Sequence, residues 1–396
     1  MTTSIMRLTG ALLVGFITVA VALVYWQVFR APELVARADN PRLIQAELRV
    51  KRGSLLDRTG MVLAFSAPAH LSDSDQVVFR RHYPELAAAH LVGYYSLRHG
   101  TGGCEAVFDA TLRGKRTQIE ELLHRPQLGE DVTLSVSLAA TRAADVALGD
   151  HIGALVALDI VSGEILAIVS HPSYDPNRLD NEWERLATDP AAPLLNRATQ
   201  GVYPVGDLAR WIGLAGLLSA GITTPPNPLE VPLEVLLAPL SRMGYLATAH
   251  QLGFTKTPLT VLPASPGRLP NFKGKTTERD LAVTPLHMAR FIAAVAGDGR
   301  MPAVRLERTT TPATMERIFS EYVARTLRNI TPKHDEIAGW LGIASPVETG
   351  RESLTWFVGY APTTYPKVAV AVVIEDEDDR LVASSIAHRT LATLLQ

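Results

Sequence analysis

The chain has 396 residues and a mass of 42.9 kDa, which is enough for one large domain and a smaller module. Its formal net charge of -2 provides no broad basic field for nucleic acid. The single cysteine, Cys104, excludes an intramolecular disulfide and any metal site built from several cysteines.

An uncharged apolar segment lies near the N-terminus. Residues 8–26 form a run that, as a helix, can cross a hydrocarbon layer of about 30 Å. Tyr25 and Trp26 end the run, as interfacial aromatic residues often do. A cleaved signal peptide is the alternative, but its small-residue site at 36–38 lies far beyond the apolar core. We therefore predict a short tail at 1–7 and an uncleaved transmembrane anchor at 8–27.

A small mixed domain is predicted over residues 28–130. Within it, Asp57-Arg58-Thr59-Gly60 reads as a turn between two apolar stretches. Cys104 has no base beside it in the sequence, so we expect it to be a packing residue.

A larger α+β domain is predicted over residues 131–396. Apolar runs at 154–158 and 164–169 predict a β-hairpin, and those at 356–360 and 368–374 predict a second one. Between the hairpins, Thr284 and Pro285 are typical of a helix start, and Gly297 ends the apolar face. Strands at both ends with helices between them indicate a sheet flanked by helical layers.

Several segments resemble class B penicillin-binding proteins, in order and at family spacing. The opening segment of the family is matched at 52–60, and the short penicillin-binding protein A subtype at 92–96, 103–105 and 112–114. The transpeptidase segments are Gly153–Asn177, Asn196–Gly201, Tyr203–Arg210 and Trp356–Pro362. The resemblance implies a membrane helix, a small non-catalytic pedestal resembling a dimerisation domain, and a transpeptidase domain of the penicillin-binding-protein/β-lactamase-like fold. It also implies that the large domain lies outside the bacterial cytoplasmic membrane, with the tail inside.

The nucleophile motif is changed at both reactive positions. The family segment runs approximately Asn-Arg-Ala-x-x-x-x-Tyr-Pro-Pro-Gly-Ser-x-x-Lys, so by resemblance the serine falls on Asp207 and the lysine on Arg210. The chemistry needs a hydroxyl and a nearby amine that takes its proton. Asp207 cannot form the same acyl-enzyme, and Arg210 stays charged and cannot act as the base.

The other two family motifs are also degenerate. The Lys-Thr-Gly strand is matched to Glu348, Thr349 and Gly350, followed by Arg351. Glu348 reverses the charge at the position of the family lysine. Ser-x-Asn is expected near Val231-Pro232-Leu233, and this motif occurs nowhere in the chain. No lysine has a serine three residues before it, and the nearest imitation, Thr364–Lys367, contains a helix-breaking proline.

These losses suggest a structure for the former active site. We expect Asp207, Arg210 and Glu348 to form an ion network in the nucleophile pocket, because an unpaired arginine at the floor of a cleft would be costly. An exposed helical pair of Asp207 and Arg210 is the alternative. The acidic run Glu375–Asp379 is expected to be a solvated turn after the last strand. We expect no metal site and no cofactor, because no metal-ligand spacing occurs.

The leading functional hypothesis is an anchored pseudotranspeptidase that acts as a scaffold or regulator in peptidoglycan assembly. The resemblance implies membrane lipid around the anchor and a partner such as a glycan polymerase of the SEDS type; peptidoglycan peptides are further candidates. One alternative is an active D,D-transpeptidase that binds penicillin through an unrecognised nucleophile, or a hydrolase that uses Asp207. Another is a muropeptide sensor without turnover, in which Arg210 or Arg351 replaces the lost lysine.

Overall fold

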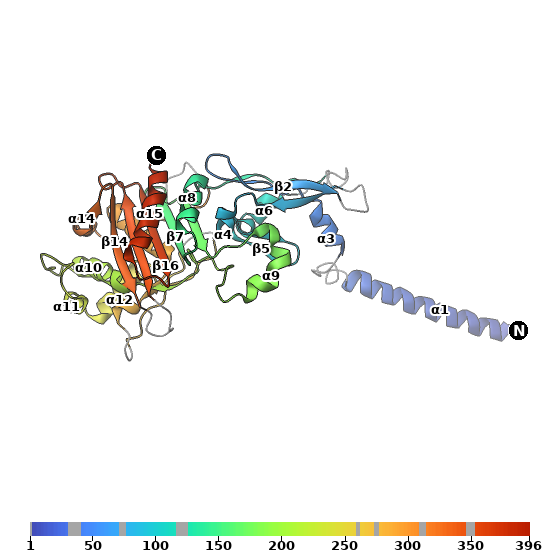
Figure 1. Ribbon diagram of the computed structural model, residues 1–396. Helices are drawn as coiled ribbons and strands as arrows, with labels where there is room; N and C mark the ends of the chain where they lie inside the picture. Colours follow the sequence, from blue (N-terminus) through green and yellow to red (C-terminus); the bar gives the residue numbers. More distant parts are fainter. Residues whose placement is uncertain are drawn as a thin grey trace. The chain divides into compact units, whose positions relative to one another are not determined.

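The computed structural model describes residues 2–30, 41–70, 77–115, 126–258, 262–272, 277–308, 314–345 and 353–396 (Figure 1). The alternative cleavage site at 36–38 and the predicted site residues Glu348, Thr349, Gly350 and Arg351 lie outside the described residues. The chain divides into two compact units. The smaller comprises Met1–Lys51, Ala67–Arg80 and Arg116–Leu128, and the larger comprises Arg52–Ser66, Arg81–Lys115 and Gly129–Gln396.

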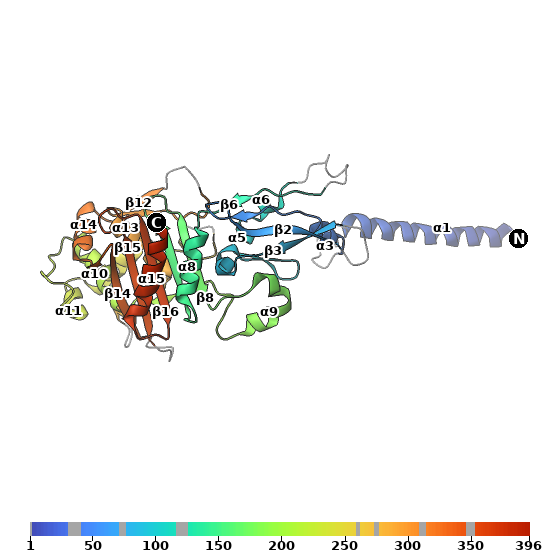
Figure 2. The ribbon, with the colours of Figure 1, turned by 45° about the horizontal axis from the view of Figure 1, so that its top comes forward.

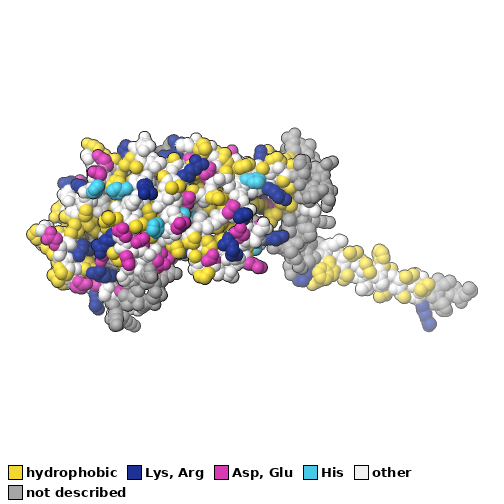
Figure 3. All heavy atoms as spheres, in the orientation of Figure 1, with side chains coloured by type: hydrophobic (Ala, Val, Ile, Leu, Met, Phe, Trp, Pro, Cys, Tyr) yellow, Lys and Arg dark blue, Asp and Glu magenta, His cyan; other side chains and the backbone are white. Residues whose placement is uncertain are grey.

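The smaller unit contains the apolar helix. Helix α1 spans Thr2–Val24 and continues as a π-helical turn, η1, over Tyr25–Phe29. Among the described residues, one helical segment is long and apolar enough to cross a membrane, Met6–Phe29, and its 24 residues correspond to about 36 Å. Hydrophobic side chains recur along it in Figure 3, and none of its apolar window is buried. A second helix, α3, spans Pro41–Leu48.

A four-stranded sheet has the order β3-β2-β1-β6. Its strands are β1 (Leu55–Leu56), β2 (Val62–His70), β3 (Val77–His82) and β6 (Val132–Thr133). The predicted turn between β1 and β2 is confirmed, because the Asp57 carboxylate accepts hydrogen bonds from the backbone N–H groups of Thr59 and Met61. Beside it lie the hairpin strands β4 (Tyr94–Ser96) and β5 (Gly100–Gly102) and the short helices η2 (Leu86–Ala88), α4 (Ala89–Val92), α5 (Gly103–Val107) and α6 (Asp109–Arg113).

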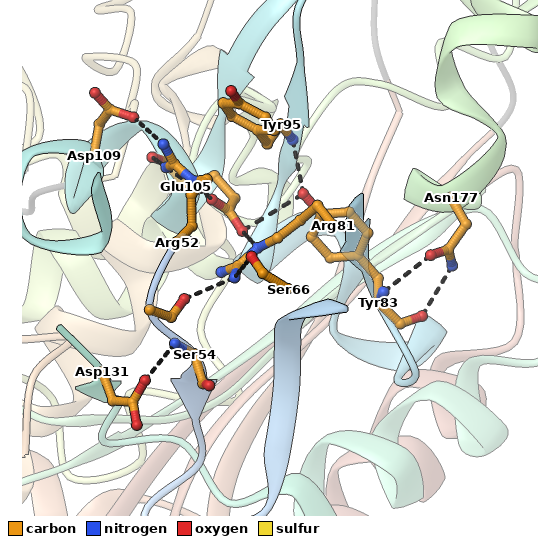
Figure 4. A network of polar contacts seen from close by, with 11 residues as sticks. Arg52, Ser54, Ser66, Arg81, Tyr83, Tyr95, Glu105, Asp109, Asp131 and Asn177 are labelled. Atoms are coloured by element: carbon orange, nitrogen blue, oxygen red, sulfur yellow. Dashed lines mark hydrogen bonds and ion pairs between the residues drawn. The ribbon is translucent and has the colours of Figure 1, made fainter. Parts of the chain in front are cut away.

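Glu105 is the centre of a buried polar network in the larger unit (Figure 4). Its carboxylate accepts hydrogen bonds from Arg52 Nη2 at 3.0 Å and Arg81 Nε at 2.5 Å. Arg52 also donates to Asp109 and lies over the ring of Tyr95. The network therefore connects the opening segment of the resemblance to α5 and α6. Cys104, next to Glu105, is fully buried, as expected for a packing residue.

The largest sheet has six antiparallel strands in the order β13-β14-β15-β16-β7-β8. Both predicted hairpins are confirmed: β7 (Gly153–Asp159) pairs with β8 (Ile165–His171), and β15 (Leu354–Ala361) pairs with β16 (Val368–Glu375). The hairpins lie side by side because β16 pairs with β7, which joins segments about 200 residues apart. At one end are β14 (Ile337–Ala344) and the two-residue strand β13 (Lys333–His334).

Helices cover both faces of this sheet (Figure 2). Alternate residues of one strand point to opposite faces, so Leu155 and Ala157 pack under α8 (Leu138–Leu148) and α15 (Arg380–Leu394). Ala154 and Val156 belong to the larger core that contains α13 (Pro285–Ala296). The α+β prediction is therefore confirmed.

The remaining elements are η3 (Pro176–Arg178), α9 (Leu179–Thr188), β9 (Tyr203–Pro204), η4 (Gly206–Leu208), α10 (Ala209–Ser219), α11 (Leu233–Leu237), α12 (Arg242–Gln251), η5 (Glu278–Asp280), β10 (Ala282–Val283), β11 (Arg300–Pro302), β12 (Met315–Arg317) and α14 (Glu321–Ile330).

Helix α13 begins and ends where the sequence predicts. The Thr284 hydroxyl accepts a hydrogen bond from the backbone N–H of His287, and Gly297 is the residue after the last turn. His287 returns the contact, because its Nδ1 accepts from the Thr284 backbone N–H while its Nε2 faces the Lys256 carbonyl oxygen. This arrangement uses the neutral imidazole, and burial lowers the pKa of His287 to about 4.

Candidate active site

Asp207 lies in the turn η4, between the short strand β9 and helix α10. Strand β9 is held by pairing with β10, so the turn has a fixed starting point. The preceding residue, Gly206, has φ +52, and a Cβ there would lie 2.2 Å from the Ile343 carbonyl oxygen. Only glycine therefore lets the turn approach β14 this closely. The position matched by resemblance to the family serine therefore holds a carboxylate in a closely packed turn.

Both carboxylate oxygens of Asp207 are occupied. Oδ1 accepts from Arg279 Nη1 at 2.7 Å, and Oδ2 accepts from Arg380 Nη2 at 3.1 Å. Oδ2 also accepts a longer hydrogen bond, 3.4 Å, from the backbone N–H of Ile343 in β14. We call Asp207, Arg279 and Arg380 the ion bridge. It joins η4, η5 and the start of α15, and its side chains are 31–53% exposed.

Arg210 does not belong to this bridge, so the predicted Asp207–Arg210 pair is wrong. Its Nη1 donates instead to the carbonyl oxygens of Pro228, at 2.6 Å, and Val231, at 2.7 Å. These carbonyls lie in a loop that needs donors, whereas the acid is already paired with two other arginines. Burial lowers the pKa of Arg210; the Asp207 and Glu234 carboxylates oppose this and the Arg279 cation adds to it, and the guanidinium remains a cation. The expected third member, Glu348, lies outside the described residues.

The strand that contacts η4 is β14, and the sequence analysis did not identify it. Trp340, in this strand, is 1% exposed and stacks on Trp211 of α10 with ring centroids 4.4 Å apart. Its Nε1 donates to Thr331, and Phe291 packs against its ring at 5.2 Å. The strand alternates inward and outward residues, with Gly342 facing Leu208. That alternation, interrupted by glycines, is the signal that could have found the strand.

Two cavities lie beside Asp207. One, of about 340 Å³, is lined by Asp207, Arg279, Asp280 and Arg380 together with Thr277 and Ser345, among others. The other, of about 330 Å³, lies among α10, the loop residue Leu229, Leu233 at the start of α11, and β14. The nucleophile position, the segment where Ser-x-Asn is expected, and the strand next to η4 therefore converge on this second cavity. Among the described residues, no lysine lines either of them.

A buried cluster holds the segment before Asp207. Arg197 Nε donates to Glu375 Oε1 at 2.8 Å, and the Tyr203 hydroxyl donates to the same oxygen at 2.8 Å. We call Arg197, Tyr203 and Glu375 the buried clamp. The side chains of Arg197 and Glu375 are 5% and 6% exposed, so the prediction that Glu375 lies in a solvated turn is wrong. The acid is the last residue of β16 and faces inward, because Arg197 and Tyr203 supply the partners that a buried carboxylate needs.

The family profile described as the penicillin-binding protein transpeptidase domain matches residues 153–227 and 240–396, more than half of the chain. The chain belongs to the penicillin-binding protein transpeptidase family. Residues 52–124 match the penicillin-binding protein A dimerisation domain, so this is a class B member of the penicillin-binding protein A type. The residues between the two matched parts, 228–239, contain the loop that Arg210 contacts and the segment where Ser-x-Asn is expected.

Relatives match along most of the chain. The peptidoglycan D,D-transpeptidase PbpA of Mycolicibacterium smegmatis is 28% identical over 493 aligned positions, covering 100% of this chain and 99% of the relative. MrdA of Escherichia coli K12, also a peptidoglycan D,D-transpeptidase, is 36% identical over 37% of this chain and 25% of its own length. Penicillin-binding protein A from M. tuberculosis, in its imipenem acyl-enzyme complex, superposes with a TM-score of 0.78 at 26% identity, covering 88% of this chain and 99% of that one.

Proposed function

We propose that this chain is a membrane-anchored pseudotranspeptidase that acts as a scaffold or regulator in peptidoglycan assembly and does not cross-link peptides itself. The observation that supports this most is the ion bridge: a carboxylate stands at the nucleophile position and both of its oxygens are engaged. A carboxylate paired with two arginines is a weaker nucleophile and base than a free one, since reaction would have to break both pairs.

The described groups around Asp207 also do not support acyl transfer. The base position holds Arg210, whose cation cannot accept a proton. The β14 backbone N–H nearest to Asp207, that of Ile343, already donates to the Asp207 carboxylate. A donor engaged in this way is not free to stabilise an oxyanion. Within β14, the inward position 340 holds an uncharged tryptophan that stacks on Trp211.

Acylation by a fluorescent penicillin tests the catalytic half of the proposal. The full chain, purified in detergent, is incubated with the label beside penicillin-binding protein A from M. tuberculosis, for which a penicillin G acyl-enzyme structure is known. We expect a covalent band for the control and none for this chain. A band that survives denaturation and disappears in Ser345→Ala or Thr277→Ala, the two hydroxyl residues lining the first cavity, would overturn the proposal.

The scaffold half concerns the anchor and the pedestal. We propose that α1 holds the protein in the cytoplasmic membrane with the large domain outside, and that α1 and the pedestal contact a SEDS-type glycan polymerase. In cells depleted of the native protein, Asp207→Ala should restore growth, whereas exchange of residues 6–29 for an unrelated membrane span should not. Alkaline phosphatase fused to the C-terminus should be active if the large domain is outside. Failure of Asp207→Ala to restore growth, with the protein present at normal levels, would contradict a non-catalytic role.

A further inference from the structure

The cavity between α10 and β14 carries an excess of positive charge. Its lining includes Arg210, Arg279 and Arg380 and a single acid, Asp207, so three positive charges and one negative charge give a formal total of +2. We propose that this cavity binds a small organic anion, a carboxylate or phosphate monoester on an apolar body, without forming a covalent bond. The inference rests on the proposed function, because it takes the site to be non-acylating.

The arginines have donors to spare. Arg210 uses only Nη1 for the two loop carbonyls, which leaves Nε and Nη2 without a hydrogen-bond partner among the described residues. Arg279 and Arg380 each give one nitrogen to Asp207. The further acid near Arg279, Glu234, lies 3.7 Å away and is 74% exposed. Since a guanidinium has five N–H groups, the three side chains can hold an additional anion while the ion bridge persists.

The remaining walls of the cavity are apolar. They are formed by Trp211, Leu229, Leu233, Trp340 and Leu341. A volume of about 330 Å³ is at the small end of the range for ligand pockets and suits one compact molecule. Apolar walls lower the local dielectric, which strengthens the attraction between an anion and the arginines. Charge and shape together therefore favour an anion with an apolar body over a neutral or cationic ligand.

The neighbouring cavity provides an internal contrast. It shares Asp207, Arg279 and Arg380 with the cavity between α10 and β14 but adds Asp280, so two positive and two negative charges give a total of zero. Of the two cavities, Arg210 lines only the one between α10 and β14. This residue is therefore the one whose charge separates an anion pocket from a balanced cleft.

Calorimetric titration of the full chain in detergent tests the proposal with three probes. They are N-acetylphenylalanine, its neutral amide, and phenyl phosphate. We expect at least one anion to bind with Kd at or below about 1 mM and the amide to bind at least about tenfold more weakly. Binding of the carboxylate alone indicates a peptide end as the source, and binding of the phosphate alone indicates a phosphorylated molecule. Equal binding of the amide, or no saturable binding of either anion, would overturn the proposal.

Two substitutions locate the site. Arg210→Gln should weaken anion binding about tenfold or more, whereas Arg325→Gln, which changes an exposed arginine paired with Glu321 on α14, should leave it unchanged. If Arg210→Gln does not fold, Asp207→Asn gives an independent reading: removing the competing carboxylate should tighten anion binding severalfold, and unchanged or weaker binding contradicts the site. Penicillin labelling of the same sample separates the two ideas. A covalent label refutes the proposed function, while no label and no anion binding refutes only this pocket.

Discussion

Two arginine–carboxylate clusters lie close together along the chain, one containing Tyr203 and the other Asp207, and they differ in burial. The buried clamp holds the Arg197 and Glu375 side chains at 5–6% exposure, whereas the ion bridge leaves its three side chains 31–53% exposed. Water and salt screen the second cluster but not the first. The buried clamp therefore supports the fold before the turn, and the main effect of the ion bridge is to engage both oxygens of the Asp207 carboxylate. Substitutions in each cluster, compared by the free energy of unfolding and by penicillin labelling, test this difference.

The largest effect is expected at Trp340. We call this residue, its ring partners Trp211 and Phe291, and the buried clamp the buried framework. Trp340→Lys places a cation inside the stack formed with Trp211 and Phe291 and removes a large buried side chain. We expect a loss of at least about 4 kcal/mol in the free energy of unfolding, measured by denaturant titration, and no gain of penicillin labelling. Leu341→Lys is the matched control. The Leu341 side chain is 38% exposed, so this substitution should cost far less free energy of unfolding. A stable, penicillin-reactive Trp340→Lys protein would show that the fold tolerates a cation at this position.

Glu375→Gln tests the buried clamp directly. The substitution keeps the shape of the side chain but leaves Arg197 as a buried cation without its counter-charge. We expect a loss of about 3 kcal/mol, somewhat moderated by the carbonyl oxygens of Ala191 and Ala192, which also accept from Arg197. The control is Glu321→Gln on the surface of α14, where the change should stay within about 0.5 kcal/mol. Similar losses for the two variants would remove the distinction between buried and exposed pairs.

His287, buried in the first turn of α13, gives the fold a pH dependence. Its folded pKa of about 4 lies below the usual value of 6.5, so as the pH falls from 6.5 to 4 the unfolded chain takes up a proton that the folded chain does not. Stability is thus full above pH 6.5, and about 3 kcal/mol is lost by pH 4. His287→Gln keeps an oxygen to cap Thr284 and should flatten this part of the curve in thermal unfolding. His90, also with a pKa of about 4, retains its own contribution. An unchanged slope would mean that His287 is protonated in the folded state.

The smallest effect is expected at Asp207. Asp207→Ala removes the centre of the ion bridge, yet its partners are half exposed and can be solvated by water. We expect a change of no more than about 1 kcal/mol in unfolding free energy. A loss equal to that of Glu375→Gln would make the ion bridge part of the framework.

The parts of the fold that the sequence predicted depend on local patterns. The two hairpins follow from apolar runs joined by short turns, and α13 follows from Thr284, Pro285 and Gly297. Strand β14 was not predicted because Gly339 and Gly342 interrupt its apolar alternation. The family motif was matched to Glu348, Thr349 and Gly350, which follow this strand in the sequence. Motif matching therefore located Asp207 and Arg210 but not the strand beside them.

The partners within the site could not be read from the sequence. Arg279 and Arg380 reach Asp207 from positions 72 and 173 residues away, and neither lies in a family motif matched by resemblance. The proximity of Arg210 in the sequence suggested an ion pair that the loop carbonyls of Pro228 and Val231 prevent. Glu375 illustrates the same limit, because an acidic run at a strand end is usually solvated and only the fold brings Arg197 to its first residue.

The stack of Trp340 on Trp211 has a consequence for the chemistry of such a site. Substituting serine at 207 and lysine at 210 would leave the two indole rings in contact beside them, with the inward face of β14 filled. Removing one ring would open a void that the other cannot fill. If the site is non-acylating, as we propose, gaining acyl-transfer chemistry would therefore also require this aromatic pair to be replaced, and removal of either ring alone would cost stability.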